Sequence, residues 1–223
     1  PGPNDTWRNS PNPDGPVDHE VPVLQVFDAG KKLKGILFGY ACHATTLSVM
    51  EINGDWPGYA QQYLEEEHPG TIAMFINGAS ADQNPYPRRL QVYVERHGRS
   101  LSTAVEAAME TSPTEIRGPL RAALAWPEIP YQAAPTTGEL QERMNSGDRY
   151  EARHASFLLD ALKAGGSLPE SYPVPVQVIR FGETMTWITM GGEVVVDYAL
   201  RLKREMGEKS GAPVWFAGYS NDV

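Results

Sequence analysis

The chain has 223 residues, enough to bury a core in one large domain or two small ones. Its hydrophobic fraction of 41% and charged fraction of 21% are ordinary for a soluble globular protein. The formal net charge of −9 argues against a surface that binds nucleic acid or anionic membranes, because both require a basic footprint.

Neither a signal peptide nor an apolar run of membrane-spanning length is recognisable in the sequence. The single cysteine, Cys42, excludes an internal disulfide framework, and its place at the end of an apolar run favours a buried, unreactive thiol over a nucleophile. The chain opens on PGPNDTWRNSPNPDGP, which has the composition of a loop, and it stops at Tyr219–Val223 just after a strand. Both ends are interpreted as cuts through a larger protein.

The first part of the chain predicts an extended segment followed by a hairpin. Residues 1–20 hold five of the 19 prolines and are expected to form an extended surface segment. A strand over 21–27, a turn at Asp28–Lys31 and a strand over 33–42 follow. The second strand is almost continuously apolar, as expected when both faces are covered, and it ends on His43.

A helix and a second buried strand come next. Asp55 is expected to N-cap a helix over 56–67, with Pro57 in the first turn, where its missing N–H costs nothing. The apolar strand over 71–76 then runs into a polar loop that contains glycine, Asn77–Pro85. A polar loop therefore follows each of the first two buried strands.

Apolar residues recur at helical spacing over 88–110 and predict an amphipathic helix. His97 lies on or beside its apolar stripe, which favours a hydrogen-bonded core or boundary histidine. A strand is expected over 120–126 and an irregular extended piece over 127–135.

The next segment predicts helix with one interruption. Thr136 and Glu139 have the spacing of a capping box, and the helical pattern continues to about residue 164. Asn145–Asp148 predicts a break in that pattern. His154 lies in the charged, exposed part and is assigned no role.

The last fifty residues predict a hairpin over 174–181 and 185–190, a helix over 194–209 and a strand over 214–217. Gly191-Gly192-Glu193 connects the hairpin directly to the helix. Together these elements predict an α/β fold, with a mixed β-sheet core and flanking helices, as a single domain over 1–223.

Three loops that follow apolar strands carry concentrated polar chemistry: those around His43, Ser80–Asn84 and Glu193. Open α/β sheets bind ligands outside the carboxyl ends of their strands, so the site is expected there. An imidazole and a carboxylate suit a zinc ion, which in catalytic sites takes about three protein ligands and keeps a position for water. The alternatives are a hydrogen-bonded histidine at a strand end and a plain carboxylate at a helix N-terminus.

Ser80 offers a second chemistry, that of a serine nucleophile. The segment Gly78–Asp82 lacks the second glycine of the G-x-S-x-G elbow, and Pro85 and Pro87 stand where a helix should begin. Hydrogen bonding within the loop is therefore the favoured interpretation of Ser80.

Five segments in order resemble the N-terminal catalytic domain of the neutral/alkaline (non-lysosomal) ceramidase family. Cys42–Thr46 is similar to the family's His-x-Thr-Ser stretch, and Gly54–Ala60 to its Gly-Asp-Asn-Lys-Gly-Tyr-Ala. Asn77–Pro85 resembles its Asn-Ala-Gly-Asp-Val-Ser-Pro-Asn loop, and Gly191–Glu193 its Pro-Gly-Glu. Gly218–Asp222 is similar to the Asn-Asp stretch that precedes a Gly-Tyr pair. The order and approximate spacing hold from about residue 8 to 223.

The resemblance implies a zinc-dependent amidase, because the family cleaves the N-acyl bond of ceramide, and a secreted or periplasmic location. It implies that His43 and Glu193 are zinc ligands. Two further ligands, a histidine before residue 1 and a tyrosine after Val223, would lie outside this chain, so the ligand set is incomplete. Arg8 matches the family's arginine that contacts the substrate, although the local order of residues differs.

One departure from the family bears on the reaction. The family's active-site serine precedes a proline, and here Asn84 precedes Pro85. An asparagine amide can donate to an oxyanion but cannot act as a nucleophile. With this departure, the resemblance implies a hydrolase that uses metal-activated water on a small-molecule or lipid amide whose identity is open.

A second function class also remains open at this stage. A non-catalytic relative could keep the loops and bind a ligand or partner without turnover. The oligomeric state is not predicted.

Overall fold

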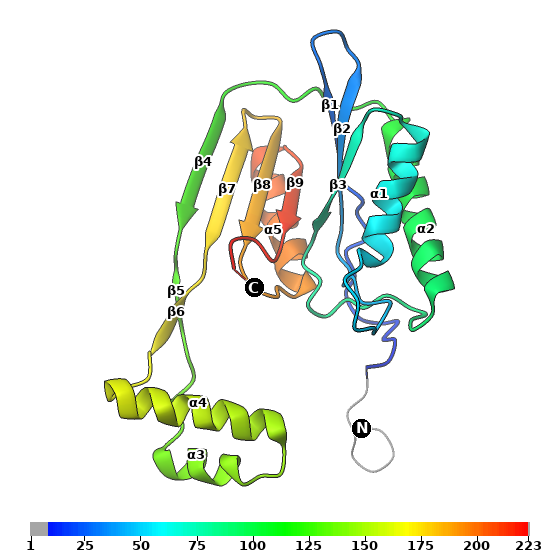
Figure 1. Ribbon diagram of the computed structural model, residues 1–223. Coiled ribbons are helices and arrows are strands. Elements are labelled where there is room, and N and C mark those ends of the chain that lie inside the picture. Colours follow the sequence, from blue (N-terminus) through cyan, green and yellow to red (C-terminus); the bar gives the residue numbers. More distant parts are fainter. Residues whose placement is uncertain (1–8, 223) are drawn as a thin grey trace. The chain divides into compact units, whose positions relative to one another are not determined.

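The computed structural model describes residues 9–222 and confirms the α/β class, with mixed sheets and flanking helices (Figure 1). The chain divides into two compact units: the described parts of Pro1–Leu124 with Val176–Val223, and Ala125–Pro175. Within the expected extended segment, residues 9–20 form no helix or strand. No helix in the described part of the chain is long and apolar enough to cross a membrane.

Strand β2 (Leu33–Tyr40) is the centre of a three-stranded sheet. It pairs antiparallel with β1 (Val23–Phe27) and parallel with β3 (Ile72–Asn77). Helices α1 (Asp55–Glu67) and α2 (Gln91–Met109) pack against this sheet (Figure 1). The buried residues of the shared core are Ile36, Phe38, Trp56, Ala60, Leu64, Ala73, Val94, Leu101 and Val105.

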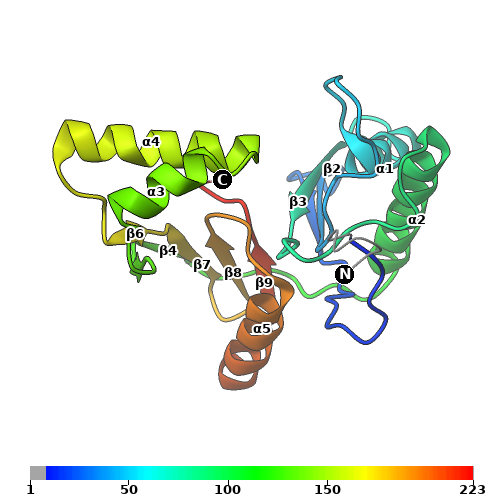
Figure 2. The same ribbon diagram turned by 90° about the horizontal axis from the view of Figure 1, so that it is seen from below.

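The second sheet of the same unit has the order β4-β7-β8-β9. Its strands are β4 (Leu120–Ala125), β7 (Val176–Phe181), β8 (Met185–Met190) and β9 (Val214–Ala217). The β7–β8 pair is antiparallel and the β8–β9 pair is parallel. Helix α5 (Val196–Ser210) lies against this sheet (Figure 2). Ala79, from the loop after β3, belongs to the buried cluster that they share.

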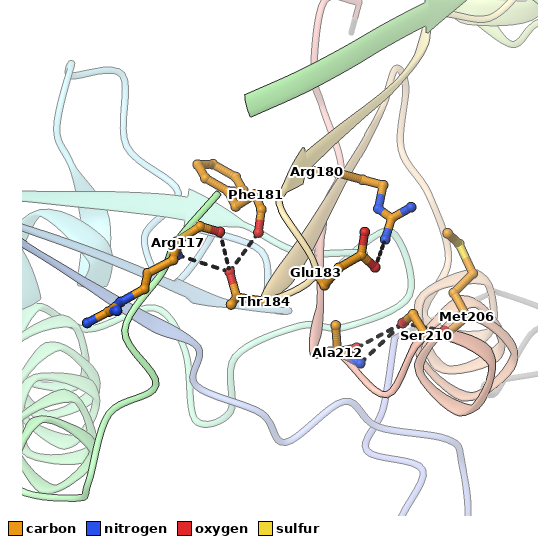
Figure 3. Close-up of polar contacts among 8 residues, drawn as sticks. All are labelled: Arg117, Arg180, Phe181, Glu183, Thr184, Met206, Ser210 and Ala212. Carbon is orange, nitrogen blue, oxygen red and sulfur yellow. Dashed lines mark hydrogen bonds and ion pairs between the residues drawn. The ribbon is translucent and has the colours of Figure 1, made fainter. Parts of the chain in front are cut away.

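The turn between β7 and β8 is tied to the segment that enters β4. Thr184 Oγ1 donates to the backbone oxygen of Phe181 at 2.6 Å and also contacts the backbone of Arg117 (Figure 3). A Cβ on Gly182 would lie 2.3 Å from the Arg117 backbone oxygen, and Gly182 has a φ of +55°. The close approach and the left-handed backbone both require glycine at this position.

The second unit contains a two-stranded ribbon, β5 (Glu128–Pro130) with β6 (Ser171–Pro173), and two helices. Helix α3 spans Thr137–Met144 and α4 spans Arg149–Gly165, which confirms the predicted break. Thr136 and Glu139 form the predicted capping box. The sequence predicts an irregular extended piece here, and the pairing of β5 with β6 is not recognisable from it.

The expected N-cap role of Asp55 is wrong. Gly54 is the N-cap of α1, and Asp55 is the first helical residue, with a left-handed φ of 45°. Its buried carboxylate instead accepts hydrogen bonds from the backbone N–H groups of Leu47 and Trp56, at 2.9 and 2.8 Å. Asp55 therefore fastens the loop that follows His43 to the start of α1.

Candidate functional site

Four loops leave the carboxyl ends of two parallel strand pairs. His43 follows β2, and the segment Asn77–Pro85 begins at the end of β3, where Tyr40 and Asn77 are register partners. Glu193 follows β8, and Tyr219 follows the neighbouring strand β9. Within each parallel pair the two carboxyl ends are adjacent, so each pair places two of these loops side by side.

Backbone hydrogen bonds connect the loops of one sheet to those of the other. The His43 N–H donates to the Gln83 oxygen at 2.9 Å. From the other sheet, Val194 accepts from the Ala81 N–H at 3.2 Å. The loop after β3 therefore contacts both the His43 loop and the Glu193 loop, so the three polar loops singled out in the sequence lie together.

The segment after β9 joins this group of loops. The Gly218 N–H donates to the Asn77 oxygen at 3.1 Å, and the Tyr219 N–H donates to the Gly192 oxygen at 3.2 Å. In return, the Gly192 N–H donates to the Asp222 oxygen at 2.9 Å. Tyr219 is thus fixed between the loop after β3 and the loop that carries Glu193.

His43 and Glu193 both lie near Tyr219. The imidazole of His43 is half-buried and packs edge-on against the Tyr219 ring, with centroids 6.0 Å apart and planes at 62°. The backbone oxygen of His43 accepts a hydrogen bond from Trp56 Nε1 at 2.9 Å. Burial raises the pKa of Tyr219, and the negative charges of Glu193 and Asp82 add to that effect, while the Ser80 hydrogen bond opposes it.

Ser80 is completely buried behind these loops. Asn77 Nδ2 donates to the Ser80 hydroxyl at 3.0 Å, and Ser80 in turn donates to the Tyr219 hydroxyl at 3.0 Å. The hydroxyl therefore makes hydrogen bonds inside the loop cluster, as the favoured interpretation of this residue expected.

Asn84 lies at the exposed side of the same loop. Its Oδ1 accepts from Thr45 Oγ1 at 3.3 Å and from Arg88 at 3.0 Å. These bonds orient the amide and occupy its acceptor oxygen, so that Nδ2 is the group left to donate. Arg8, the other predicted substrate contact, lies outside the described residues.

Asp82 and His97 are two further titratable side chains near these loops, and both make hydrogen bonds. Asp82 Oδ1 accepts from the Val196 N–H at the start of α5, at 3.0 Å. His97 Nε2 contacts the Pro87 backbone oxygen at 2.9 Å and is partly buried, which confirms the boundary histidine. Burial raises the pKa of the Cys42 thiol to about 12, as expected of an unreactive cysteine.

The donor set for zinc is incomplete within the described residues. Among residues 9–222, no three His, Cys, Asp or Glu side chains form a group that could hold a metal ion. A catalytic zinc takes about three protein ligands. His43 and Glu193 therefore stay a prediction as zinc ligands, and other groups would have to complete the coordination.

A cavity of about 520 Å³ borders the exposed loop at Asn84. Tyr40 and Cys42, Trp56 from α1 and His97 from α2 line it together with apolar side chains. The cavity therefore opens beside the core that β2 shares with the two helices.

The fold was compared with solved structures. The crystal structure of neutral ceramidase from Pseudomonas aeruginosa matches with a TM-score of 0.64 and 18% identity, over 91% of this chain and 40% of that one. A structure described as a ceramidase complexed with C2 matches with a TM-score of 0.60 and 18% identity, over 93% of this chain and 43% of that one. The chain has a ceramidase-like fold. Neither protein-family profiles nor curated proteins give a match.

The chain spans about two fifths of the length of these solved ceramidases. Tyr219 has no assigned role in the sequence patterns, although it lies in the Gly218–Asp222 segment that resembles the ceramidase family. One local pattern points to Tyr219: a Gly-Tyr pair comes directly after the short buried strand β9. The three polar loops follow buried strands in the same way.

Proposed function

We propose that this ceramidase-like chain is part of a zinc-dependent hydrolase that cleaves an amide (N-acyl) bond with a metal-activated water. The observation that carries the proposal is the meeting of the His43, Asn77–Pro85 and Glu193 loops around Tyr219. The ceramidase-like fold supports the same reaction class and a small-molecule or lipid amide as the substrate.

Each residue has a distinct role in the proposed reaction. His43 would offer a neutral imidazole and Glu193 a carboxylate to the metal, with the remaining ligands supplied from outside this chain. Bound zinc would lower the pKa of its water toward 7 and polarise the scissile carbonyl. Asn84 would present its Nδ2 to the oxyanion, and Arg8 would contact the substrate.

The proposal is tested by assaying the natural full-length protein on N-acyl amides, including ceramide, with matched esters alongside. We expect amide hydrolysis that is lost on chelation and restored by added zinc. His43→Ala and Glu193→Gln should each abolish it.

His154→Ala is the matched control, because this histidine is exposed on α4 and belongs to the other compact unit. It should leave the rate unchanged. Specific binding of an amide or a protein partner without turnover would favour a non-catalytic relative and would contradict the proposal.

A further inference from the structure

Tyr219 is anchored through its hydroxyl to a buried polar chain. Asn77 holds the Ser80 hydroxyl and Ser80 holds the phenol oxygen, each at 3.0 Å. Ser80 is fully buried, so its end of this contact is shielded from competing water. The position of the phenol is therefore determined by residues at the end of β3.

The backbone of Tyr219 is also constrained. Its φ of 52° lies in the left-handed region, which a bulky side chain rarely adopts. Such a conformation persists only where the surroundings fix it. Here the Gly192 oxygen accepts from the Tyr219 N–H, and the Met190 oxygen accepts from the Ser220 N–H at 3.0 Å.

The Tyr219 ring also packs against the His43 ring, with the two centroids 6.0 Å apart. The backbone of His43 is held separately by Gln83 and by Trp56, so rotation of the imidazole is its main remaining freedom. An aromatic ring packed edge-on against the imidazole restricts that rotation.

We propose that Tyr219 is a positioning residue, which sets the orientation of the His43 imidazole and is itself held in place by the Ser80 hydroxyl. The assignment of His43 as a metal ligand rests on the proposed function, but the contact between the two rings does not. The role needs no proton transfer from Tyr219.

The test measures access to the His43 ring in the metal-free 223-residue chain. Diethyl pyrocarbonate modification is followed by mass spectrometry, with exposed His154 as the internal reference. Tyr219→Ala should raise the rate at His43 several-fold, while Tyr198→Ala, which removes an exposed tyrosine on α5, should not. Circular dichroism melting curves confirm that each variant is folded.

Removing the hydrogen bond between Ser80 and Tyr219 gives a more specific test of the proposal. Tyr219→Phe and Ser80→Ala each remove it from one side, so both should raise the rate to the same intermediate level. The double variant should show no further increase, because the two side chains act as one unit. Additive effects, or an unchanged rate in Tyr219→Ala, would overturn the proposal.

Zinc affinity of the natural full-length protein supplies a second readout. Loss of a group that orients a ligand costs roughly 10–100-fold in metal affinity. Tyr219→Ala should show that loss, and Tyr219→Phe should recover most of it. A wild-type protein that binds no zinc would remove the metal proposal, while the modification rates would still decide the role of Tyr219.

Discussion

Asp82 accepts a hydrogen bond from the backbone N–H of Val196, 114 residues further along the chain. The N-cap of α5, Val195, has no side-chain cap of its own, so Asp82 supplies one from the loop after β3. The same contact anchors the helix that begins three residues after Glu193. One carboxylate therefore links two of the loops in the candidate site.

Removing this cap should destabilise the protein. Asp82→Ala should lower the free energy of unfolding by about 0.5–2 kcal/mol, the usual cost of losing a helix cap. Urea denaturation followed by circular dichroism measures it. Asp82→Asn keeps an acceptor at Oδ1 and is the matched control, with a smaller expected loss. Equal losses in both variants would show that charge, rather than the hydrogen bond, is what matters.

Cys42 should react slowly with thiol reagents. Its pKa is raised from 9.0 to about 12, mainly by burial, so at pH 8 the thiolate fraction is lower by about 10³. The iodoacetamide rate in the folded chain should be lower by about the same factor than in urea. The free energy of unfolding should also fall from pH 9 upward relative to Cys42→Ala, because the unfolded thiol ionises first. Fast alkylation of the folded chain at pH 8 would contradict this assignment.

Asn84 and Ser80 should differ in their effect on turnover. Asn84→Ala should lower the amide hydrolysis rate of the natural full-length protein by roughly 10²–10³-fold, the scale for loss of one oxyanion donor. Ser80→Ala should do much less, because its buried hydroxyl only holds Tyr219. Steady-state kinetics of both variants measures the two effects on turnover. Complete loss in Ser80→Ala with a silent Asn84→Ala would identify Ser80 as a nucleophile.

Most elements could be predicted from the sequence because their signals are local. The apolar strand before His43 and the capping box at Thr136 are recognised within a few residues of chain. The helix break before Arg149 is similar, since Asp148 caps the new helix with its own side chain. The placement of polar loops after buried strands followed from the same patterns.

The remaining features depend on contacts between distant segments. Aspartate is a residue type that favours the N-cap position. However, the Asp55 carboxylate accepts from the Leu47 N–H, and Asp55 is the first residue of the helix. The pairing of β5 with β6 joins segments on either side of two helices. The Ser80–Tyr219 bond spans 139 residues, so no local pattern could indicate that Tyr219 lies beside His43.

Zinc content is the most direct test of the proposed hydrolase. The natural full-length protein, purified without chelator, should contain one zinc per chain by inductively coupled plasma mass spectrometry. His43→Ala and Glu193→Gln should each lower that content strongly, whereas His154→Ala should retain it. Stoichiometric zinc that survives both substitutions, or a folded, active protein with no zinc, would contradict the account.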